Sequence, residues 1–440
     1  MERHGAKIKK LLLGGILLVM LLPLLQQHVK FHESKPLKGA HVPAPEVYFS
    51  IDSWTNGDFQ SGYENWFNEN FGFRPEMVRV HNQIAYSLYN EAKANSVIIG
   101  KENYLYEESY LKAYTGKDYI GRNQINEMTG KIKELQDSLE NRGITLIVCL
   151  AAGKASFYPE YIPDSYGKAS DSTNYKVFAQ LLNEKNVNHI DYNKWFMNMK
   201  GKTAFPLYPK TGIHWSRYGS LLATDSLINY VEAKRNVDMP EIVWEKTVFS
   251  DTLEQPDEDI GLAMNLIWPI KHLAMGHPIY HFEDTTGKAH VRMMTISDSF
   301  FWSMFDIGLA PSTFSDIRFY YYNNEVYHTD GTAWHYADLE SEMRDADQSN
   351  VIVLMATESN LFGFGWGFIN DAFNHFVLHK MVQTQDGLVR KYQADIRKDE
   401  AWMKAIQAKA AQNGISLDSM IYLDAKYMAD EEWKKNNSAQ

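Results

Sequence analysis

The sequence predicts an α/β fold in which a mostly parallel sheet carries helices on both faces. Short apolar runs of strand length alternate along the chain with amphipathic helical segments, and this alternation is typical of parallel strands joined by helical crossovers. Several of the runs are apolar at almost every position, as in strands that are covered on both faces. With 440 residues, 45% of them hydrophobic, the chain is long enough to bury a large core.

The N-terminus has the layout of a secretory signal or a signal-anchor. Basic residues between Arg3 and Lys10 precede residues 11–25, a stretch without charge, and this order is typical of both kinds of segment. No small-x-small cleavage pattern follows Leu25, so we expect an uncleaved anchor over residues 1–31. The basic side should stay in the cytoplasm, which leaves the rest of the chain outside the cytoplasmic membrane, in the periplasm.

Composition argues against several classes of function. The net charge is −11 and no long basic run follows the N-terminus, so we expect no nucleic-acid partner. The single cysteine, Cys149, lies in an apolar run and predicts a buried, inert thiol. His277 and His281 have helix-like spacing, but Pro278 interrupts it and no further ligand stands at metal-binding spacing. We expect no metal and no cofactor.

The segment before the sheet is predicted to contain a linker, helices and a hairpin. Residues 32–50 are rich in proline and polar residues, as in a linker. Residues 53–90 are aromatic and predicted to be helical, with a break at residues 71–75. Residues 97–106 alternate in polarity around a turn at residues 100–103, as in a β-hairpin.

The clearest helix covers residues 123–141, where apolar residues recur at steps of three and four before Gly143 ends the pattern. Residues 144–150 follow as a buried strand. The same order recurs, with helices predicted over residues 172–185 and 216–233 and strands over residues 189–192, 293–296, 317–321 and 351–356. In the tail, residues 388–412 are predicted as one charged helix and Ser416 as the cap of a second, which together form a helical hairpin.

One stretch, residues 291–302 (VRMMTISDSFFW), combines a strand with small polar residues and the start of a helix. Side chains at such a turn project past the carboxyl edge of a parallel sheet. Ser299 can therefore be a nucleophile if a base lies within reach. A Ser-Asp helix cap is the commoner use of these residue types.

The base that the sequence offers is His214, in residues 208–219 (YPKTGIHWSRYG). Ser216 can cap the helix that follows, so His214 lies on a loop just before a helix start, at the rim of the sheet. Most histidines in such a place serve packing or capping. A neutral imidazole is nevertheless the usual base for a serine nucleophile.

These segments resemble the SGNH-hydrolase-like domain of the alginate O-acetyltransferase family, of the AlgJ and AlgX type. The resemblance rests on His-Trp-Ser before a helix, on the later strand that ends in Asp-Ser-Phe, and on three further motifs in the family's order. These are residues 66–74 (WFNENFGFR), 97–106 (VIIGKENYLY) and 153–163 (GKASFYPEYIP). Together the motifs span about residues 60–365.

The resemblance implies an SGNH-hydrolase-like fold and an O-acetyltransferase activity. Ser299 would accept an acetyl group and pass it to a polysaccharide hydroxyl, and His214 would move the protons. The family also implies a membrane-bound acyltransferase of the MBOAT type as the acetyl donor. The 11 Trp and 26 Tyr suit sugar rings, although they suit ordinary packing equally well.

The expected organisation is an anchor over residues 1–31, a linker over 32–52, the acetyltransferase domain over 53–383 with its core at about 96–383, and a helical extension over 384–440.

One position departs from the family. The family places Asp two residues before the histidine, where it orients the imidazole, and this sequence has Gly212. A dyad oriented by a backbone carbonyl keeps some catalysis. Asp191, Asp298 or Glu358, at or near strand ends, could also take the orienting role. Alternatively, the site has become a binding surface.

An oxyanion also needs donors. The backbone N–H of Ser299 or Phe300 is the expected one, and the side chains of Asn323 and Asn360 are candidates beside their ordinary role in turns. Two other functions remain open on the sequence. The first is a carbohydrate acetyl-esterase with the same serine chemistry, and the second is a non-catalytic polysaccharide-binding or assembly subunit.

Overall fold

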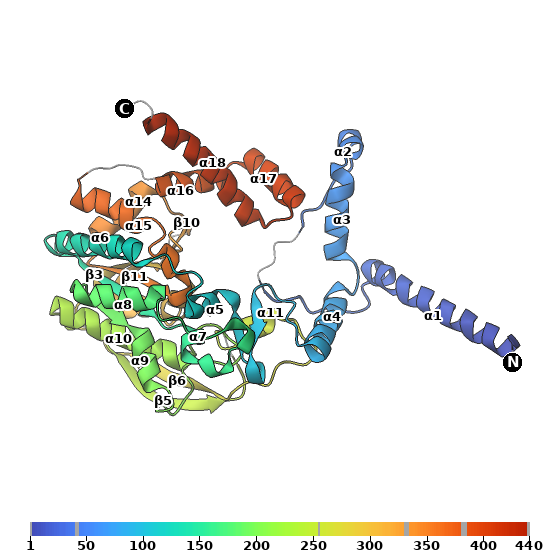
Figure 1. Ribbon diagram of the computed structural model, residues 1–440, viewed down its shortest axis with the longest axis horizontal. Coiled ribbons are helices and arrows are strands. Elements are labelled where there is room, and N and C mark those ends of the chain that lie inside the picture. The colour runs from blue at the N-terminus through green and yellow to red at the C-terminus, as the bar shows by residue number, and fades with distance from the viewer. Residues whose placement is uncertain (1, 40–43, 254–255, 330–333, 380–384, 438–440) are drawn as a thin grey trace. The chain divides into compact units, whose positions relative to one another are not determined.

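The computed structural model describes residues 2–39, 44–253, 256–329, 334–379 and 385–437. The chain divides into two compact units (Figure 1). The first comprises residues 1–107, 210–213 and 258–272, and the second comprises residues 108–209, 214–257 and 273–440. Residues 40–43 of the predicted linker and the predicted boundary at residue 383 lie outside the described residues.

The first unit is mostly helical. Its N-terminal helix α1 (Glu2–Val29) contains a stretch, Lys9–Val29, that is long and apolar enough to cross a membrane. The predicted break at residues 71–75 and the predicted hairpin are confirmed: α3 stops at Asn70 and α4 starts at Arg74, and β1 pairs with β2 in antiparallel. The remaining bounds are α2 (Ile51–Asn56), α3 (Asp58–Asn70), α4 (Arg74–Tyr89), β1 (Val97–Ile99), β2 (Leu105–Glu107) and α11 (Asp259–Ala263).

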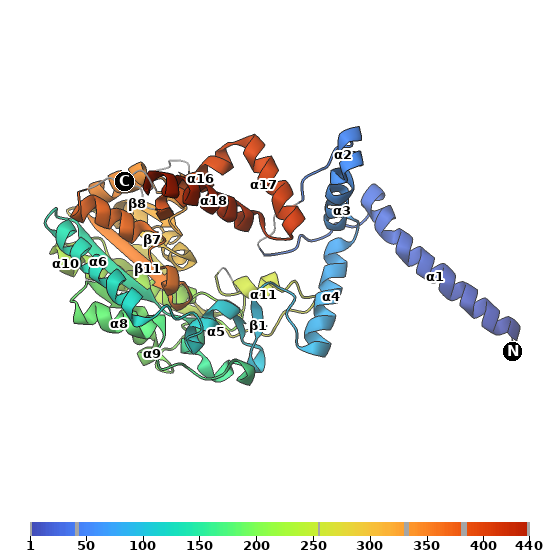
Figure 2. The ribbon, with the colours of Figure 1, turned by 45° about the horizontal axis from the view of Figure 1, so that its top comes forward.

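The second unit is built on a seven-stranded sheet, which confirms the predicted α/β fold. The strand order is β10-β9-β8-β7-β11-β3-β4, with β8 to β4 parallel and β9 and β10 antiparallel at one edge. Figure 2 shows β7, β8 and β11 side by side. The strands are β3 (Thr145–Ala151), β4 (His189–Asp191), β7 (Val291–Ser297), β8 (Phe314–Tyr321), β9 (Glu325–His328), β10 (His335–Tyr336) and β11 (Val351–Thr357).

Helices cover both faces of this sheet, and its central strands β7, β11 and β3 are therefore buried at almost every position. In β3, Leu146, Val148 and Leu150 belong to a core shared with the predicted helix α6 (Arg122–Glu140) and with α8 (Asn174–Glu184). Successive side chains of a strand point to opposite faces, so Ile147 and Cys149 face the other side. That side carries α9 (Tyr192–Met199) and α10 (Arg217–Arg235). Burial raises the pKa of the Cys149 thiol, as expected for an inert cysteine.

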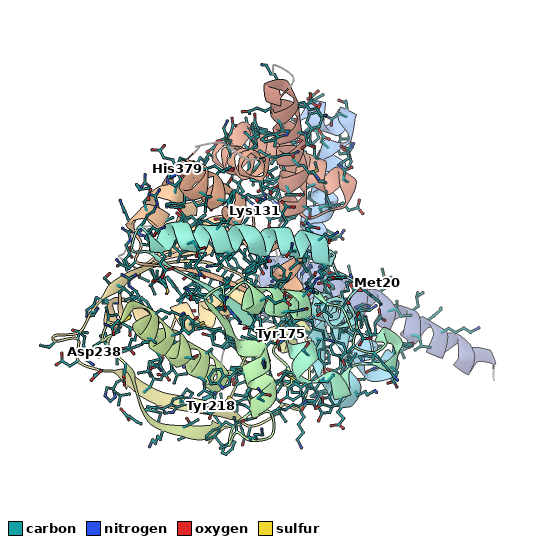
Figure 3. All side chains as sticks on the ribbon, turned by 60° about the vertical axis from the view of Figure 1, so that its left-hand side comes forward. Met20, Lys131, Tyr175, Tyr218, Asp238 and His379 are labelled. Carbon is teal, nitrogen blue, oxygen red and sulfur yellow. The ribbon has the colours of Figure 1, made fainter. Side chains whose placement is uncertain are left out.

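A two-stranded ribbon that the sequence did not predict follows α10. It pairs β5 (Ile242–Ser250) with β6 (Met275–Phe282) in antiparallel, and β6 packs on α10. Tyr218 of α10, labelled in Figure 3, contacts the ribbon through Trp244, with ring centroids 5.5 Å apart. His277 and His281 therefore lie on a strand, and their spacing is not that of a helix.

Residues 385–437 of the C-terminal extension, the part that the structure describes, form three helices, whereas two were predicted. The predicted helix over residues 388–412 is broken at Asp399, whose carboxylate accepts hydrogen bonds from the N–H groups of Ala401 and Trp402 and so starts a new helix. The resulting helices are α16 (Gln385–Lys398), α17 (Glu400–Asn413) and α18 (Leu417–Asn437), which share a small core of their own.

Candidate active site

The end of β7 forms the floor of the candidate site. Ser297 closes the strand, Asp298 caps the short helix η4 (Ser299–Phe301), and α12 (Trp302–Phe305) continues it. Asp298 accepts a hydrogen bond from the Phe300 N–H at 3.1 Å. Local sequence explains this turn, since a carboxylate before an aromatic segment satisfies the unpaired N–H groups of a helix start.

The second carboxylate oxygen of Asp298 ties this turn to the neighbouring strand β11. It accepts hydrogen bonds from the Thr357 N–H, the Thr357 hydroxyl and the Asn360 side chain, each at 2.8 Å. Asp298 is fully buried. A buried carboxylate with four donors fixes the backbone on which Ser299 stands.

His214 is held by the start of α10. The Ser216 hydroxyl accepts a hydrogen bond from the Gly219 N–H at 3.0 Å and donates one to the Pro206 carbonyl at 2.8 Å. The adjacent Trp215 is fully buried and donates its indole N–H to the Ser303 hydroxyl at 2.6 Å. These contacts fix the backbone directly after His214 and join its loop to α12.

The two elements bring His214 and Ser299 together. Ser299 Oγ lies 2.8 Å from His214 Nε2, although 85 residues separate the two in the chain. The Phe300 ring packs against the imidazole with centroids 4.7 Å apart. Both side chains are only half-buried, so the pair lies within reach of solvent.

This geometry suits activation of a hydroxyl by a base. A neutral imidazole at hydrogen-bond distance can accept the serine proton as the oxygen attacks an electrophilic carbon. The Ser299 N–H is the first of η4, where helix geometry provides no acceptor within the helix. Such an N–H, next to the nucleophile, can donate to an oxyanion.

The candidate carboxylates other than Asp298 lie in other hydrogen-bond networks. Asp191 caps α9 through the Lys194 N–H at 2.8 Å and accepts the Tyr175 hydroxyl at 3.1 Å. Glu358 is buried and accepts hydrogen bonds from Ser156, at 2.7 Å, and from Asn193. Burial raises the pKa of Glu358 to about 7, and the hydrogen bonds from Ser156 and Asn193 oppose the increase.

The two candidate asparagines also have partners. Asn360 donates to Asp298, and its second contact is the Thr357 hydroxyl at 3.3 Å. Asn323 is buried after β8 and donates to the Trp366 carbonyl at 3.3 Å. Both amides therefore support the turns around the site.

Sequence reasoning missed two residues that support the pair. Thr357 makes two of the four hydrogen bonds to Asp298, and Ser303 receives the indole N–H of the residue beside His214. Thr357 ends the strand that pairs with β7. A polar residue at the end of an adjacent parallel strand is the signal that could have identified it.

Parts of this chain are similar to a known family and to known proteins. The model described as "SGNH hydrolase-like domain, acetyltransferase AlgX" matches residues 97–255, a range that contains His214 and ends before Ser299. The probable alginate O-acetylase AlgJ of Pseudomonas aeruginosa is 22% identical over 186 residues, which are 42% of this chain and 45% of that protein. AlgJ of Pseudomonas putida is 21% identical over 176 residues, 40% of this chain and 44% of that protein. The aligned part thus spans less than half the length of these relatives.

Several solved structures are also similar to this chain. The O-acetyltransferase domain of Pseudomonas putida AlgJ is 16% identical with a TM-score of 0.41, over 63% of this chain and 99% of that one. Bacillus cereus PatB1 is 13% identical with a TM-score of 0.35, over 55% of this chain and 91% of that one. The family model and the curated relatives thus show that part of this chain is similar to the AlgX/AlgJ-type SGNH hydrolase-like domain.

Proposed function

We propose that this protein is an O-acetyltransferase that moves an acetyl group, through an acetyl-Ser299 intermediate, to a hydroxyl of a cell-surface or secreted polysaccharide. The observation that carries the proposal is the 2.8 Å separation of Ser299 Oγ and His214 Nε2 at the carboxyl edge of a parallel sheet. The curated relatives are named probable alginate O-acetylases, which supports the same chemistry.

The proposed reaction has two halves. In the first, Ser299 Oγ attacks the carbonyl carbon of an acetyl donor while His214 Nε2 takes the serine proton. The donor's leaving group departs with that proton. In the second half, His214 takes the proton of a sugar hydroxyl as its oxygen attacks the acetyl carbon, and the proton returns to Ser299.

Each half passes through an oxyanion. We assign its stabilisation to the Ser299 N–H, because the Phe300 N–H already donates to Asp298. Asp298 and Asn360 then act as positioning residues, because their hydrogen bonds hold the turn that carries Ser299.

The setting that we propose is the outer side of the cytoplasmic membrane. Helix α1 would act as a single-pass anchor, and the catalytic residues would face the periplasm. The acetyl group would come from a membrane-bound acyltransferase of the MBOAT type, a partner implied by the family alone.

The test uses purified full-length protein and an activated acetyl ester. Wild type should form an acetylated Ser299 detectable by mass spectrometry and transfer the group to an added oligosaccharide. Ser299→Ala should lose both, whereas Ser312→Ala, a half-buried serine of the short helix α13 (Leu309–Ser312), should keep both. Full acetylation by Ser299→Ala would contradict the proposal.

A carbohydrate acetyl-esterase is the second candidate, because the half-buried pair is reachable by water. An esterase would release acetate at the same rate with or without oligosaccharide, whereas a transferase would divert the acetyl group to sugar. If wild type neither acetylates Ser299 nor turns over the ester, the third reading, a non-catalytic binding or assembly subunit, replaces both.

A further inference from the structure

A chain of aromatic side chains leads away from the nucleophile across the antiparallel edge of the sheet. We call Trp302, Tyr327, Trp334 and Tyr336 the aromatic row. The Trp302 ring lies 4.5 Å from the Tyr327 ring, Tyr327 lies 6.4 Å from Trp334, and Trp334 lies 5.3 Å from Tyr336. All four belong to the second unit.

The inner end of the aromatic row is joined to the candidate active site. Trp302 stands three residues after Ser299, at the start of α12, and i and i+3 positions share one helix face. The next residue, Ser303, receives the Trp215 indole N–H. Trp302 also packs on the buried Phe319, with centroids 4.9 Å apart, so its position is fixed by the core.

The outer end is exposed and offers ring faces. Trp334 is 52% exposed, although it contacts a ring on each side. The planes of Tyr327 and Trp334 are inclined by only 23°, so the two rings are nearly parallel and Trp334 is the more exposed of the pair. The Tyr327 hydroxyl donates to Glu325 at 2.7 Å, so a polar group lies beside the rings. Flat rings edged by polar groups suit the apolar C–H faces and hydroxyls of a sugar.

One of the C-terminal helices, α16, contacts the aromatic row at Tyr336. The Arg397 guanidinium of α16 lies 4.9 Å from the Tyr336 ring centroid, and its side chain is only 10% exposed. It is held by Asn324 at 3.2 Å and by Asp418 of α18 at 3.2 Å. A cation fixed against a ring restricts that ring, so less freedom remains to be lost when a ligand binds.

We infer that the aromatic row is a subsite for the acceptor polysaccharide, which binds sugar units next to the unit that is acetylated. The inference rests on the proposed function, because the row is continuous with Ser299 through Trp302. The chemical class of ligand is an oligosaccharide in which the face of one sugar unit stacks on the exposed ring of Trp334. The C-terminal extension then has a role, which is to brace this subsite through Arg397.

The test measures oligosaccharide binding to full-length protein in detergent by calorimetry. The probes are hexasaccharides of glucose, N-acetylglucosamine and mannuronate. Trp334→Ala should weaken binding of the best probe at least tenfold, and Trp334→Phe should restore part of it. The control is Trp268→Ala, which removes a 69% exposed tryptophan outside the row and should change nothing. Acetylation of Ser299 by a small ester should be unaltered in all three variants.

The outcomes separate this inference from the proposed function. Binding that depends on Trp334 in a protein whose Ser299 is unreactive would keep the subsite and remove the transferase. If Trp334→Ala transfers the acetyl group with an unchanged KM for the hexasaccharide, the transferase is kept and the subsite is removed. Equal losses in Trp334→Ala and Trp268→Ala, or no binding of any probe by wild type, would overturn the subsite.

Discussion

Asp298 combines full burial with four hydrogen-bond donors aimed at one carboxylate. Asp298→Asn would turn an NH₂ group toward donors and leave a buried mismatch. We expect the free energy of unfolding to fall by about 3 kcal/mol and Ser299 acetylation to slow by about 100-fold or more. Urea denaturation and ester turnover measure the two effects.

The matched control is Asp306→Asn, which changes an exposed aspartate at the end of α12. In this control, the free energy of unfolding should stay within about 0.5 kcal/mol of wild type, and the rate of Ser299 acetylation should stay within about twofold. If Asp298→Asn resembles this control, Asp298 does not hold the nucleophile turn.

Glu358 should make stability depend on pH. Its pKa rises from 4.5 to about 7 on folding because it is buried. Between these values the folded state binds more protons than the unfolded state, so stability falls as the pH rises through this interval. Glu358→Gln removes that loss. As the pH rises from about 5 to about 8, the Tm of the Glu358→Gln variant should therefore fall less than the Tm of wild type.

Thermal unfolding at several pH values tests this, with Glu134→Gln, on the exposed side of α6, as the control. If the Tm of Glu358→Gln depends on pH as steeply as the Tm of wild type, then folding does not raise the pKa of Glu358, and the prediction is wrong.

Much of the candidate site followed from single residues. Ser299 stood out because three small polar residues interrupt an apolar run, and His214 because a capping serine follows it. The hydrogen bonds that Asp298 accepts from Thr357 and Asn360 could not be foreseen in this way. Thr357 lies 59 residues after Asp298 in the sequence, and Asn360 lies 62 residues after it. Only the pairing of β7 with β11 brings them together. The catalytic roles themselves stay predictions.

At the scale of an element, the start of α10 sets the position of His214. Ser216→Ala removes both the cap and the hydrogen bond to Pro206. We expect a loss of about 2 kcal/mol in the free energy of unfolding and slower acetylation of Ser299, because the histidine loop loosens. Chemical denaturation and ester turnover measure these.

Ser416→Ala is the matched control, since Ser416 caps α18 through the Ser419 N–H and is exposed. It should cost about 1 kcal/mol at most and leave turnover unchanged. Equal turnover in the two variants would mean that the α10 cap does not position the base.

Elements with strong periodicity were predictable, and edge elements were not. The helix over residues 123–141 and the strand over residues 144–150 match α6 and β3 within one residue, because several turns of apolar spacing define them. Strands β9 and β10 are four and two residues long, too short for a pattern. The ribbon of β5 and β6 is half exposed and mixed in composition, so neither strand forms an apolar run.

At the scale of the whole molecule, a buried ion cluster joins α16 to α14 (Leu339–Gln348) and α15 (Phe368–Ala372). Arg390 pairs with Glu342, at 3.2 Å, and with Asp371, and both carboxylates are almost fully buried. Arg390→Met would leave two buried carboxylates without their cation. We expect a loss of about 3–5 kcal/mol, measured by urea denaturation.

Arg122→Met is the control, because Arg122 pairs with Glu184 at the surface, at 3.7 Å. It should cost less than about 1 kcal/mol. Similar small losses in both variants would mean that the C-terminal helices dock mainly through their apolar contacts.

Membrane association is predicted to depend on α1. Full-length protein should stay with membranes after an alkaline carbonate wash, because its apolar stretch Lys9–Val29 is long enough to span the hydrocarbon core. A variant without residues 1–31 should be soluble, and a C-terminal alkaline phosphatase fusion of the full chain should be active. Sedimentation of the truncated variant with membranes, or an inactive fusion, would contradict the prediction.

The two edge strands of the seven-stranded sheet are short, and this affects how readily copies of the chain can pair with one another. One edge strand, β4, has three residues, and the other, β10, has two. Exposed strand edges are templates on which other copies of a chain can add, and very short edges offer few hydrogen bonds to an incoming strand. A protein confined to a membrane surface meets its own copies far more often than one in solution. If α1 anchors this protein as proposed, its short sheet edges would limit edge-to-edge pairing between neighbouring copies on the membrane.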